Sequence, residues 1–427
     1  MSIYKNLTPL QKRAALALAI ICSANYWSGA TRLVIPYIIN QYVDRYDITT
    51  IQRLLNIGSP VGMAVGFIAG TMGLRFNKKY LLAGSIGAMA MQYAVYFFVG
   101  MTNGPLWMLY LGSGLSGVCQ GSSLTFINSL ISEIFPGGSR ATINANLTAL
   151  MSTGSMLLNS IGGPIAAIDG GVKWYRTYLL GIYIVVAIIA MLIIMPKKWT
   201  DDTEAIEEKK KENETDTVNA DEPKFIPAKV FGLVFCGICT SLSLCAWINN
   251  TSIFIVRDYE LGTSAHAGLA SSIYSFTGLF IGITYAAWQK ILGKYIHIFG
   301  LALFTIGNLI IYTMGPTSLI PIYVAAVFIN GGFCLLNPYY ISRVMFNTPK
   351  KWLPIALAMS NIGISIGITL SVDVINGISS LFGDEGKYKF LTGALGGIFC
   401  MCIAIVVYFI WKGPYEKKAA IDEKNPA

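Results

Sequence analysis

Long apolar segments recur along almost the whole chain and are separated by short charged or Pro/Gly-rich breaks. A bilayer core about 30 Å thick requires roughly 20 apolar residues per helix, and segments of that length recur from Ala14 to Trp411. The pattern therefore predicts an all-α polytopic membrane protein with about twelve transmembrane helices. These helices lie near residues 14–40, 51–73, 79–101, 106–131, 143–168, 176–195, 228–255, 264–288, 295–315, 318–345, 354–376 and 388–411.

One segment interrupts this pattern, between Pro196 and Phe225. It contains ten of the chain's 22 acidic residues and no apolar run. Such a segment cannot bury enough apolar surface to form a core, so we expect a solvated cytoplasmic linker. The predicted organisation is an N-terminal six-helix bundle at residues 1–195, the linker at 196–225, a C-terminal six-helix bundle at 226–412 and a cytoplasmic tail at 413–427.

Similar short sequences occur at corresponding places in the two predicted bundles. Their offsets stay between 210 and 217 residues along the full chain, which favours an internal repeat. Parallel six-helix repeats are one way to build a carrier, with the substrate site at the repeat interface near the bilayer midplane. The pairs are Cys22-Ser23 with Cys239-Thr240, Tyr46-Asp47-Ile48 with Tyr259-Glu260-Leu261, Ile131-Ser132 with Ile341-Ser342, and Tyr175-Arg176 with Tyr388-Lys389.

Composition and charge agree with a protein that sits in a lipid bilayer. The chain is 54% hydrophobic and 12% charged, whereas an average soluble domain is roughly 25% charged. If both termini are cytoplasmic, 23 of the 31 Lys and Arg residues lie on the cytoplasmic side, which is the positive-inside pattern. The net charge of +9 then reflects topology and contact with anionic lipid, not a nucleic-acid partner. We expect a multi-pass monomer in the cytoplasmic membrane.

A family resemblance appears in the loop after the second predicted helix. This loop resembles the Gly-x-x-x-Asp-Arg-x-Gly-Arg-Arg signature of the major facilitator superfamily. It departs from the signature at Leu74, where the family usually has Asp, and at Asn77, where it usually has Gly. The residues that match are Gly70, Arg75, Lys78 and Lys79.

Three further segments are similar to sequences of this family. The segment from Pro136 to Arg140 resembles its cytoplasmic Pro-x-x-x-Arg turn, and Lys173-Trp174-Tyr175-Arg176 resembles its entry to the sixth helix. Gly162-Gly163-Pro164 partly resembles the Gly-Pro motif of family antiporters. The resemblance implies the major facilitator fold and transport by alternating access. It also implies a cytoplasmic gate that includes Gly70, Arg75, Lys78, Lys79, Glu133 and Arg140.

Arg32 is the one basic residue that falls within the predicted bilayer core. A charge at that depth costs roughly 2.5 to 3.5 kcal/mol on insertion scales, so its side chain should face protein or water. Asn25, Ser28, Gly29 and Pro36 share its helix face, which is polar or small. Two interpretations remain open: Arg32 snorkels to the outer headgroups, or it attracts an anion into a central cavity.

Polar stripes run along several other predicted helices. Each stripe either forms hydrogen bonds between helices or lines water, and their coincidence on the fourth, fifth, seventh and eleventh helices favours a polar cavity. The predicted substrate-binding residues are Arg32, Asn25, Tyr26, Gln120, Asn159, Asn249 and Asn361.

Only two carboxylates are predicted to lie at membrane depth, Glu133 and Asp373. A proton-coupled carrier usually needs a titratable group along its pathway, and Asp373 is the candidate. The alternatives are that Asp373 pairs with Arg32 or is exposed to outside water.

Motifs for catalysis and for metal binding are missing from the sequence. There is no phosphate loop, nucleophile elbow or His-Glu-x-x-His helix, and Cys236-x-x-Cys239 has no second pair. We therefore expect no enzyme activity, no cofactor and no metal. The leading hypothesis is a secondary active transporter that moves a small organic anion. The alternatives are an exporter of amphipathic compounds, of the multidrug-efflux type, and a membrane sensor that does not transport.

Overall fold

The computed structural model describes residues 7–25, 29–135, 137–196, 226–348 and 353–411. Every regular element within these residues is a helix. Eight helices in the described residues are long and apolar enough to cross a membrane. The predicted all-α polytopic membrane fold is therefore confirmed, whereas the count of twelve spans and the division into two six-helix repeats stay predictions.

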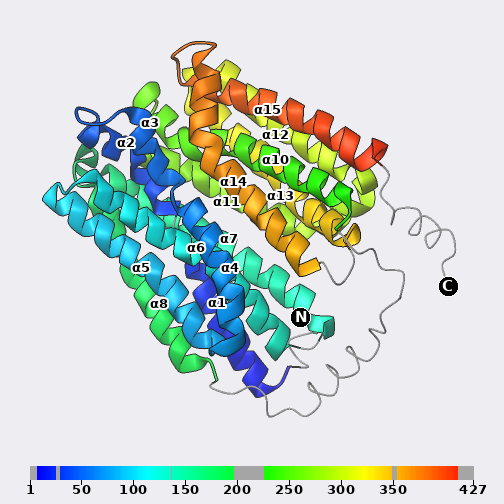
Figure 1. The fold of residues 1–427 in the computed structure, drawn as a ribbon. Helices are drawn as coiled ribbons and strands as arrows, with labels where there is room; N and C mark the ends of the chain where they lie inside the picture. Colours follow the sequence, from blue (N-terminus) through cyan, green and yellow to red (C-terminus); the bar gives the residue numbers. More distant parts are fainter. Residues whose placement is uncertain (1–6, 26–28, 136, 197–225, 349–352, 412–427) are drawn as a thin grey trace.

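The first group of helices covers residues 9–194 and is called the N-terminal group (Figure 1, blue to green). Its helices pack mainly on one another, with α5 and α4 against α6 and α1 against α7 and α8. Its elements are α1 (Pro9–Asn25), α2 (Ala30–Tyr42), α3 (Ile48–Gln52), η3 (Arg53–Leu55), α4 (Gly58–Arg75), α5 (Lys78–Thr102), α6 (Leu106–Ile134), α7 (Gly137–Ala167), η4 (Ile168–Gly171), η5 (Trp174–Leu180) and α8 (Gly181–Ile194).

The second group covers residues 228–410 and is called the C-terminal group (Figure 1, green to red). Here α12 packs against α13 and α15, and α10 packs against α14 and α15. Its elements are α10 (Ala228–Ile253), η6 (Phe254–Asp258), α11 (Ser264–Leu292), η7 (Gly293–Tyr295), α12 (Ile296–Met314), η8 (Gly315–Thr317), α13 (Leu319–Phe346), α14 (Leu353–Ser380), α15 (Lys387–Ile405) and η10 (Val406–Ile410).

The helix boundaries differ from the predicted ones where local backbone chemistry interrupts an apolar run. The helix predicted at 51–73 is divided into α3, η3 and α4. Its first turn starts early because the Asp47 carboxylate caps α3, accepting a hydrogen bond of 2.8 Å from the Thr50 backbone N–H. The helix predicted at 14–40 corresponds to α1 and α2, with residues 26–28 outside the described part.

The outward faces of both groups are apolar, as expected for surfaces in contact with lipid. Ile193 of α8 is 71% exposed and Ile283 of α11 is 72% exposed. Exposed apolar surface on this scale is unusual in water-soluble monomers. Such surfaces are favourable in a bilayer, where lipid chains cover them.

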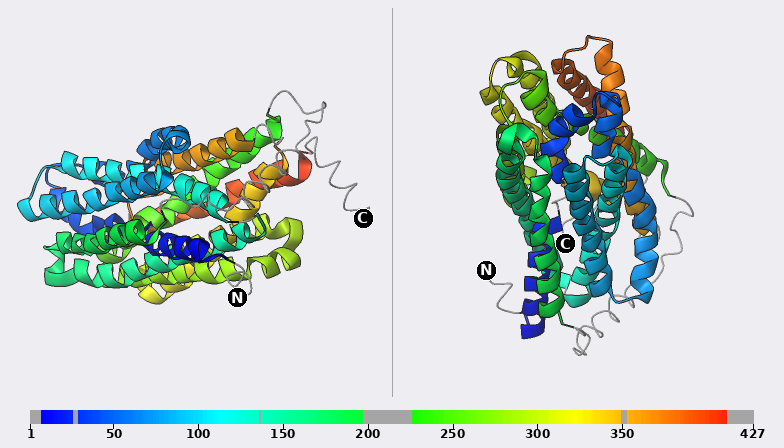
Figure 2. Two further views of the ribbon diagram at one scale, coloured as in Figure 1. Left: turned by 90° about the horizontal axis from the view of Figure 1, so that it is seen from below. Right: turned by 90° about the vertical axis from the view of Figure 1, so that its left-hand side faces the viewer.

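The two groups meet along α7 and α11 and, more locally, along α4 and α14 (Figure 1); α2 also touches α10 and α11. In both views of Figure 2 the long helices run roughly along one common direction. At the α7–α11 crossing, a Cβ on Gly163 would lie 2.5 Å from the Ser264 carbonyl oxygen. A Cβ on Gly268 would lie 2.4 Å from the Asn159 carbonyl oxygen. Glycine at both positions therefore permits a close approach of the two helices.

Candidate functional site

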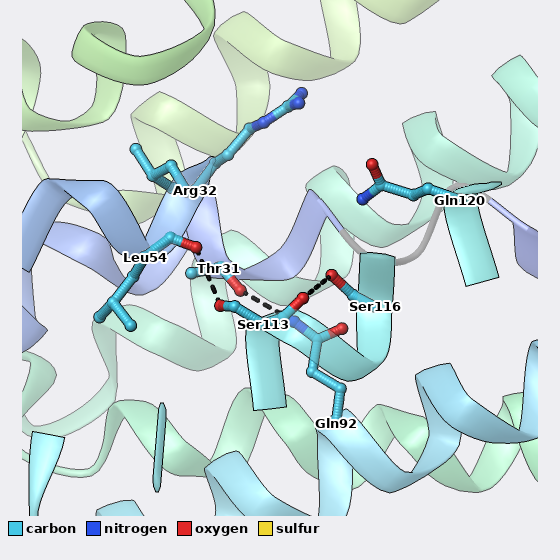
Figure 3. A pocket seen from close by; sticks show the side chains of 8 residues that line it. Thr31, Arg32, Leu54, Gln92, Ser113, Ser116 and Gln120 are labelled. Atoms are coloured by element: carbon cyan, nitrogen blue, oxygen red, sulfur yellow. Dashed lines mark hydrogen bonds between the residues drawn. The ribbon is translucent and has the colours of Figure 1, made fainter. Parts of the chain in front are cut away.

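Arg32 lies on α2, in the region where the N-terminal group faces the C-terminal group. Its side chain is exposed although Thr31 and Leu33 beside it are buried. Its polar neighbours across this space are Cys245 of α10 and Tyr274 of α11, both from the C-terminal group. Figure 3 shows the guanidinium extending away from the N-terminal wall towards helices drawn in light green. Arg32 therefore points into the space between the two groups.

No partner of opposite charge is found for this guanidinium in the described residues. No hydrogen bond or ion pair joins Arg32 to another described side chain, and no carboxylate contributes to its electrostatic surroundings there. The exposed guanidinium therefore lies beside neutral groups of the protein and has no ionic partner among the described residues. Arg32 thus presents a positive charge to the space between the two groups.

A polar pocket of about 30 Å³ lies beside Arg32 (Figure 3). Its wall is held by hydrogen bonds within the N-terminal group. The Ser113 hydroxyl donates to the Leu54 carbonyl over 2.9 Å, and the Ser116 hydroxyl donates to the Ser113 carbonyl over 2.8 Å. The residues that line the pocket are Thr31, Arg32, Leu54, Leu55, Gln92, Ser113, Ser116 and Gln120.

The other predicted binding residues are distributed over several places. Gln120 lines the same pocket as Arg32. Asn25 is buried inside the N-terminal group, with the Met151 and Cys119 sulfur atoms each 3.7 Å from its amide. Asn159 is buried on α7 at the crossing with α11, and Asn361 is exposed on α14. Tyr26 lies outside the described residues.

Asn249 belongs to a different set of contacts. Its amide nitrogen donates to the Ser371 hydroxyl over 3.1 Å, and the Asn56 amide nitrogen donates to the same hydroxyl over 2.9 Å. Asn56 is in the N-terminal group, whereas Asn249 and Ser371 are in the C-terminal group. Asn249 therefore lies beside a junction between the groups, with its own amide oxygen buried and unpartnered.

Asp373 forms an ion pair with Arg53 at the same end of the molecule. An Arg53 Nη atom lies 2.7 Å from an Asp373 carboxylate oxygen, and both side chains are about half exposed. The hydrogen bonds to Asp373, followed by its charge, raise the pKa of Arg53. Asp373 thus pairs with a residue of η3 and not with Arg32.

We call the contacts around this ion pair the junction network. They join the segment from α3 to α4 with α14, at the end of the molecule where Figure 1 labels α3. The network consists of Arg53–Asp373 at 2.7 Å, Asn56–Ser371 at 2.9 Å, Ser59 to the Ser365 carbonyl at 3.0 Å, and Asn376–Gln52 at 2.9 Å. The two groups are held together by hydrogen bonds at this end.

Three residues assigned by resemblance to a cytoplasmic gate make contacts inside the N-terminal group. Lys78 of α5 forms an ion pair with Glu133 of α6. Lys79 is buried and donates a hydrogen bond of 2.6 Å to the Met195 carbonyl, just after the end of α8. The remaining three, Gly70, Arg75 and Arg140, lie on α4 and α7, and their side chains are outside the described part of the structure.

Gln92 and Thr31 are pocket residues that sequence reasoning missed. Gln92 is the amide of a long apolar helix, α5, and its nitrogen lies 3.3 Å from the Thr31 hydroxyl. In the sequence, Gln92 is a single polar residue within an apolar run. Such a residue is more often explained by hydrogen bonding between packed helices than by a binding site.

Sequence comparison links the chain to one family and to one group of relatives. The sequence model of the Major Facilitator Superfamily matches residues 16–256, more than half of the chain. Protein spinster homolog 1 from Homo sapiens is 24% identical over 197 residues, which cover 43% of this chain and 34% of the relative. The same protein from Mus musculus is 25% identical over 178 residues, covering 38% and 33%. The chain thus matches about a third of the length of these relatives.

Solved structures show the same fold at low sequence identity. A peptide transporter, POT, superposes with a TM-score of 0.72 at 12% identity, covering 93% of this chain and 95% of its own. The nucleoside transporter NupG superposes with a TM-score of 0.67 at 11% identity, covering 92% and 100%. Together with the sequence match, this likeness shows that the chain belongs to the Major Facilitator Superfamily of membrane transporters and is not an enzyme.

Proposed function

We propose that the protein is a secondary active transporter that moves a small organic anion between the two groups of helices. The observation that carries this proposal is the exposed Arg32 side chain, which faces Cys245 and Tyr274 and has no charged partner in the described residues. Because charge interactions strengthen as water is excluded, a carboxylate or similar group gains most where a neutral protein surface surrounds the cation.

The way in which the two groups are joined supports transport by alternating access. The junction network closes the end near α3, and the α7–α11 crossing keeps the groups in contact along their length. Transport then requires the network to break while these helices shift against each other. The positive-inside distribution of Lys and Arg supports cytoplasmic termini and a cytoplasmic membrane. With this orientation the end near α3 lies on the outside, so the junction network closes the pathway on that side. We propose a monomer as the transporting unit.

A binding screen tests the assigned charge class. The purified protein is melted in the presence of carboxylates, amino acids or neutral sugars, and the melting temperature is measured. We expect carboxylates to raise the melting temperature of the wild type but not that of Arg32→Gln. The control is Arg45→Gln, which removes another exposed Arg just after the end of α2. Equal stabilisation of wild type and Arg32→Gln by a carboxylate would remove Arg32 from the site.

The second candidate function is export of amphipathic compounds. The rings of Trp247 and Tyr274 stack with centroids 5.9 Å apart, and Tyr274 is also an electrostatic neighbour of Arg32. An aromatic surface beside a cation suits a ligand with both an apolar and an anionic part. Overexpression that leaves resistance to amphipathic drugs unchanged would count against export. Counterflow of a labelled solute would exclude a sensor that does not transport.

A further inference from the structure

The pocket beside Arg32 contains a hydrogen-bond acceptor that has no donor. Gln92 is 1% exposed, and its amide nitrogen is used by the contact with Thr31 at 3.3 Å. Its amide oxygen is buried and has no hydrogen-bond partner. Figure 3 shows this oxygen on the side of the amide that faces Ser116, another residue lining the pocket. A buried carbonyl oxygen without a donor is unfavourable, because its hydration is lost and nothing replaces it.

The hydroxyl groups of Ser113 and Ser116 do not supply the missing donor. The Ser116 proton is directed to the Ser113 carbonyl, and the Ser113 proton is directed to the Leu54 carbonyl. The Ser113 hydroxyl also lies 2.6 Å from the Tyr96 hydroxyl, whereas the Ser116 hydroxyl keeps lone pairs, because a hydroxyl has one proton and two acceptor sites. The Gln92 oxygen and the Ser116 hydroxyl are therefore acceptors for a group that brings its own proton.

Other buried amide oxygens without partners do not have this setting. The Asn308 oxygen on α12 is also unpartnered, but it faces Gly393 inside the C-terminal group. Gln92 differs because it lines a pocket, and because Arg32 lines the same pocket. A volume of about 30 Å³ holds a water molecule or one small polar group, since a single water needs roughly 10 to 15 Å³ of such space.

We infer that this pocket is a subsite for the hydroxyl or ammonium group of the transported anion, whose acidic group binds Arg32. The inference rests on the proposed function and narrows it to hydroxy acids and amino acids. In this arrangement Gln92 and Ser116 accept hydrogen bonds from the donor group in the N-terminal wall. The Arg32 guanidinium holds the acidic group in the space that faces the C-terminal group.

Matched ligands that differ by one donor group test the subsite. Dissociation constants of propionate, lactate and alanine are measured by calorimetry on the purified protein, for the wild type, Gln92→Leu, Arg32→Gln and the control Asn308→Leu. We expect lactate or alanine to bind the wild type on the order of tenfold more tightly than propionate. Gln92→Leu should lose this preference and still bind propionate. Asn308→Leu, which also removes a buried amide with an unpartnered oxygen, should keep the preference.

The outcomes separate the subsite from the proposed function. If propionate binds the wild type but not Arg32→Gln, and lactate and alanine bind no better than propionate, the pocket holds water only and the subsite is wrong. An unchanged preference in Gln92→Leu overturns it as well. Binding of all three acids to Arg32→Gln with wild-type affinity overturns the proposed function together with the subsite. The comparison of lactate with alanine decides between a hydroxyl and an ammonium donor.

Discussion

Arg32 brings a charge into a part of the molecule where its described neighbours are neutral hydroxyl, thiol and amide groups. This residue could be identified from the sequence because a lone Arg in an apolar segment is costly to place in a bilayer and therefore indicates a functional or structural role. Its surroundings could not be found in the same way. Cys245 and Tyr274 are more than 200 positions away in the sequence, and their approach depends on how the two groups dock.

Lys79 makes a contact that its family resemblance does not predict. Resemblance places it in a cytoplasmic gate, whereas its hydrogen bond to the Met195 carbonyl joins α5 to the end of α8 within one group. A lysine beside carbonyls at a helix C-terminus stabilises that terminus. A sequence pattern cannot distinguish these roles, because a basic residue at the start of a predicted helix is compatible with both.

Replacement of Lys79 by Met is expected to lower the free energy of unfolding. The variant keeps the aliphatic stem but leaves the Met195 carbonyl without this donor, at a cost of about 1 to 3 kcal/mol. Thermal melting in detergent measures the change. A normal melting temperature combined with altered transport would instead assign Lys79 to gating.

At the scale of the elements, the hydrophobic pattern predicted well which segments are helical, but it predicted poorly where the helices are interrupted. The helix predicted at 51–73 corresponds to a short helix, a 3₁₀ turn and a long helix, and the Asp47 cap starts the first of these, α3, before the predicted boundary. The Gly162-Gly163-Pro164 segment, which partly resembles an antiporter motif, lies at the α7–α11 crossing. Its Gly163 has a packing role that explains its identity without reference to exchange.

A pair of identical substitutions on α11 tests this crossing. Gly268→Ala places a methyl group 2.4 Å from the Asn159 carbonyl oxygen, so the helices must separate at a cost of about 1 to 3 kcal/mol. Gly282→Ala on the same helix has nothing within 4 Å of the new atom and serves as the control. We expect Gly268→Ala to lower both the melting temperature and the transport rate. Indistinguishable behaviour of the two variants would contradict a tight crossing.

At the scale of the whole molecule, the junction network ties residues that lie more than 300 positions apart. Arg53 and Asp373 are separated by 320 residues, and Asn56 and Ser371 by 315. The internal repeat suggested by the sequence pairs corresponding positions of the two predicted bundles. It does not predict which non-corresponding residues of the two bundles come into contact. The closed end near α3 was therefore beyond sequence reasoning, although Asp373 itself stood out as a carboxylate at membrane depth.

Charge reversal tests whether Arg53 and Asp373 hold this end closed. Arg53→Asp and Asp373→Arg should each shift the protein towards opening near α3, and the double variant should recover most of the wild-type behaviour. Because both side chains are about half exposed, the shift in the opening equilibrium is expected to stay below about fivefold and to shrink at high salt. Distances between spin labels on α3 and α14 measure it.

The control for this cycle is Arg176→Asp. Arg176 pairs with Asp169 at 3.4 Å inside the N-terminal group, so its reversal changes the surface charge by the same amount without affecting the junction. An equal shift in Arg176→Asp would show that overall charge, and not this ion pair, sets the opening equilibrium.

The central claim is that Arg32 binds the negative group of the transported solute. Its most direct test is counterflow of a labelled carboxylate, chosen by the binding screen, in liposomes that contain wild type, Arg32→Gln, Arg32→Lys or Arg45→Gln. We predict normal uptake for wild type and Arg45→Gln, partial uptake for Arg32→Lys, and a loss of roughly tenfold or more for Arg32→Gln. Full uptake by Arg32→Gln would contradict it.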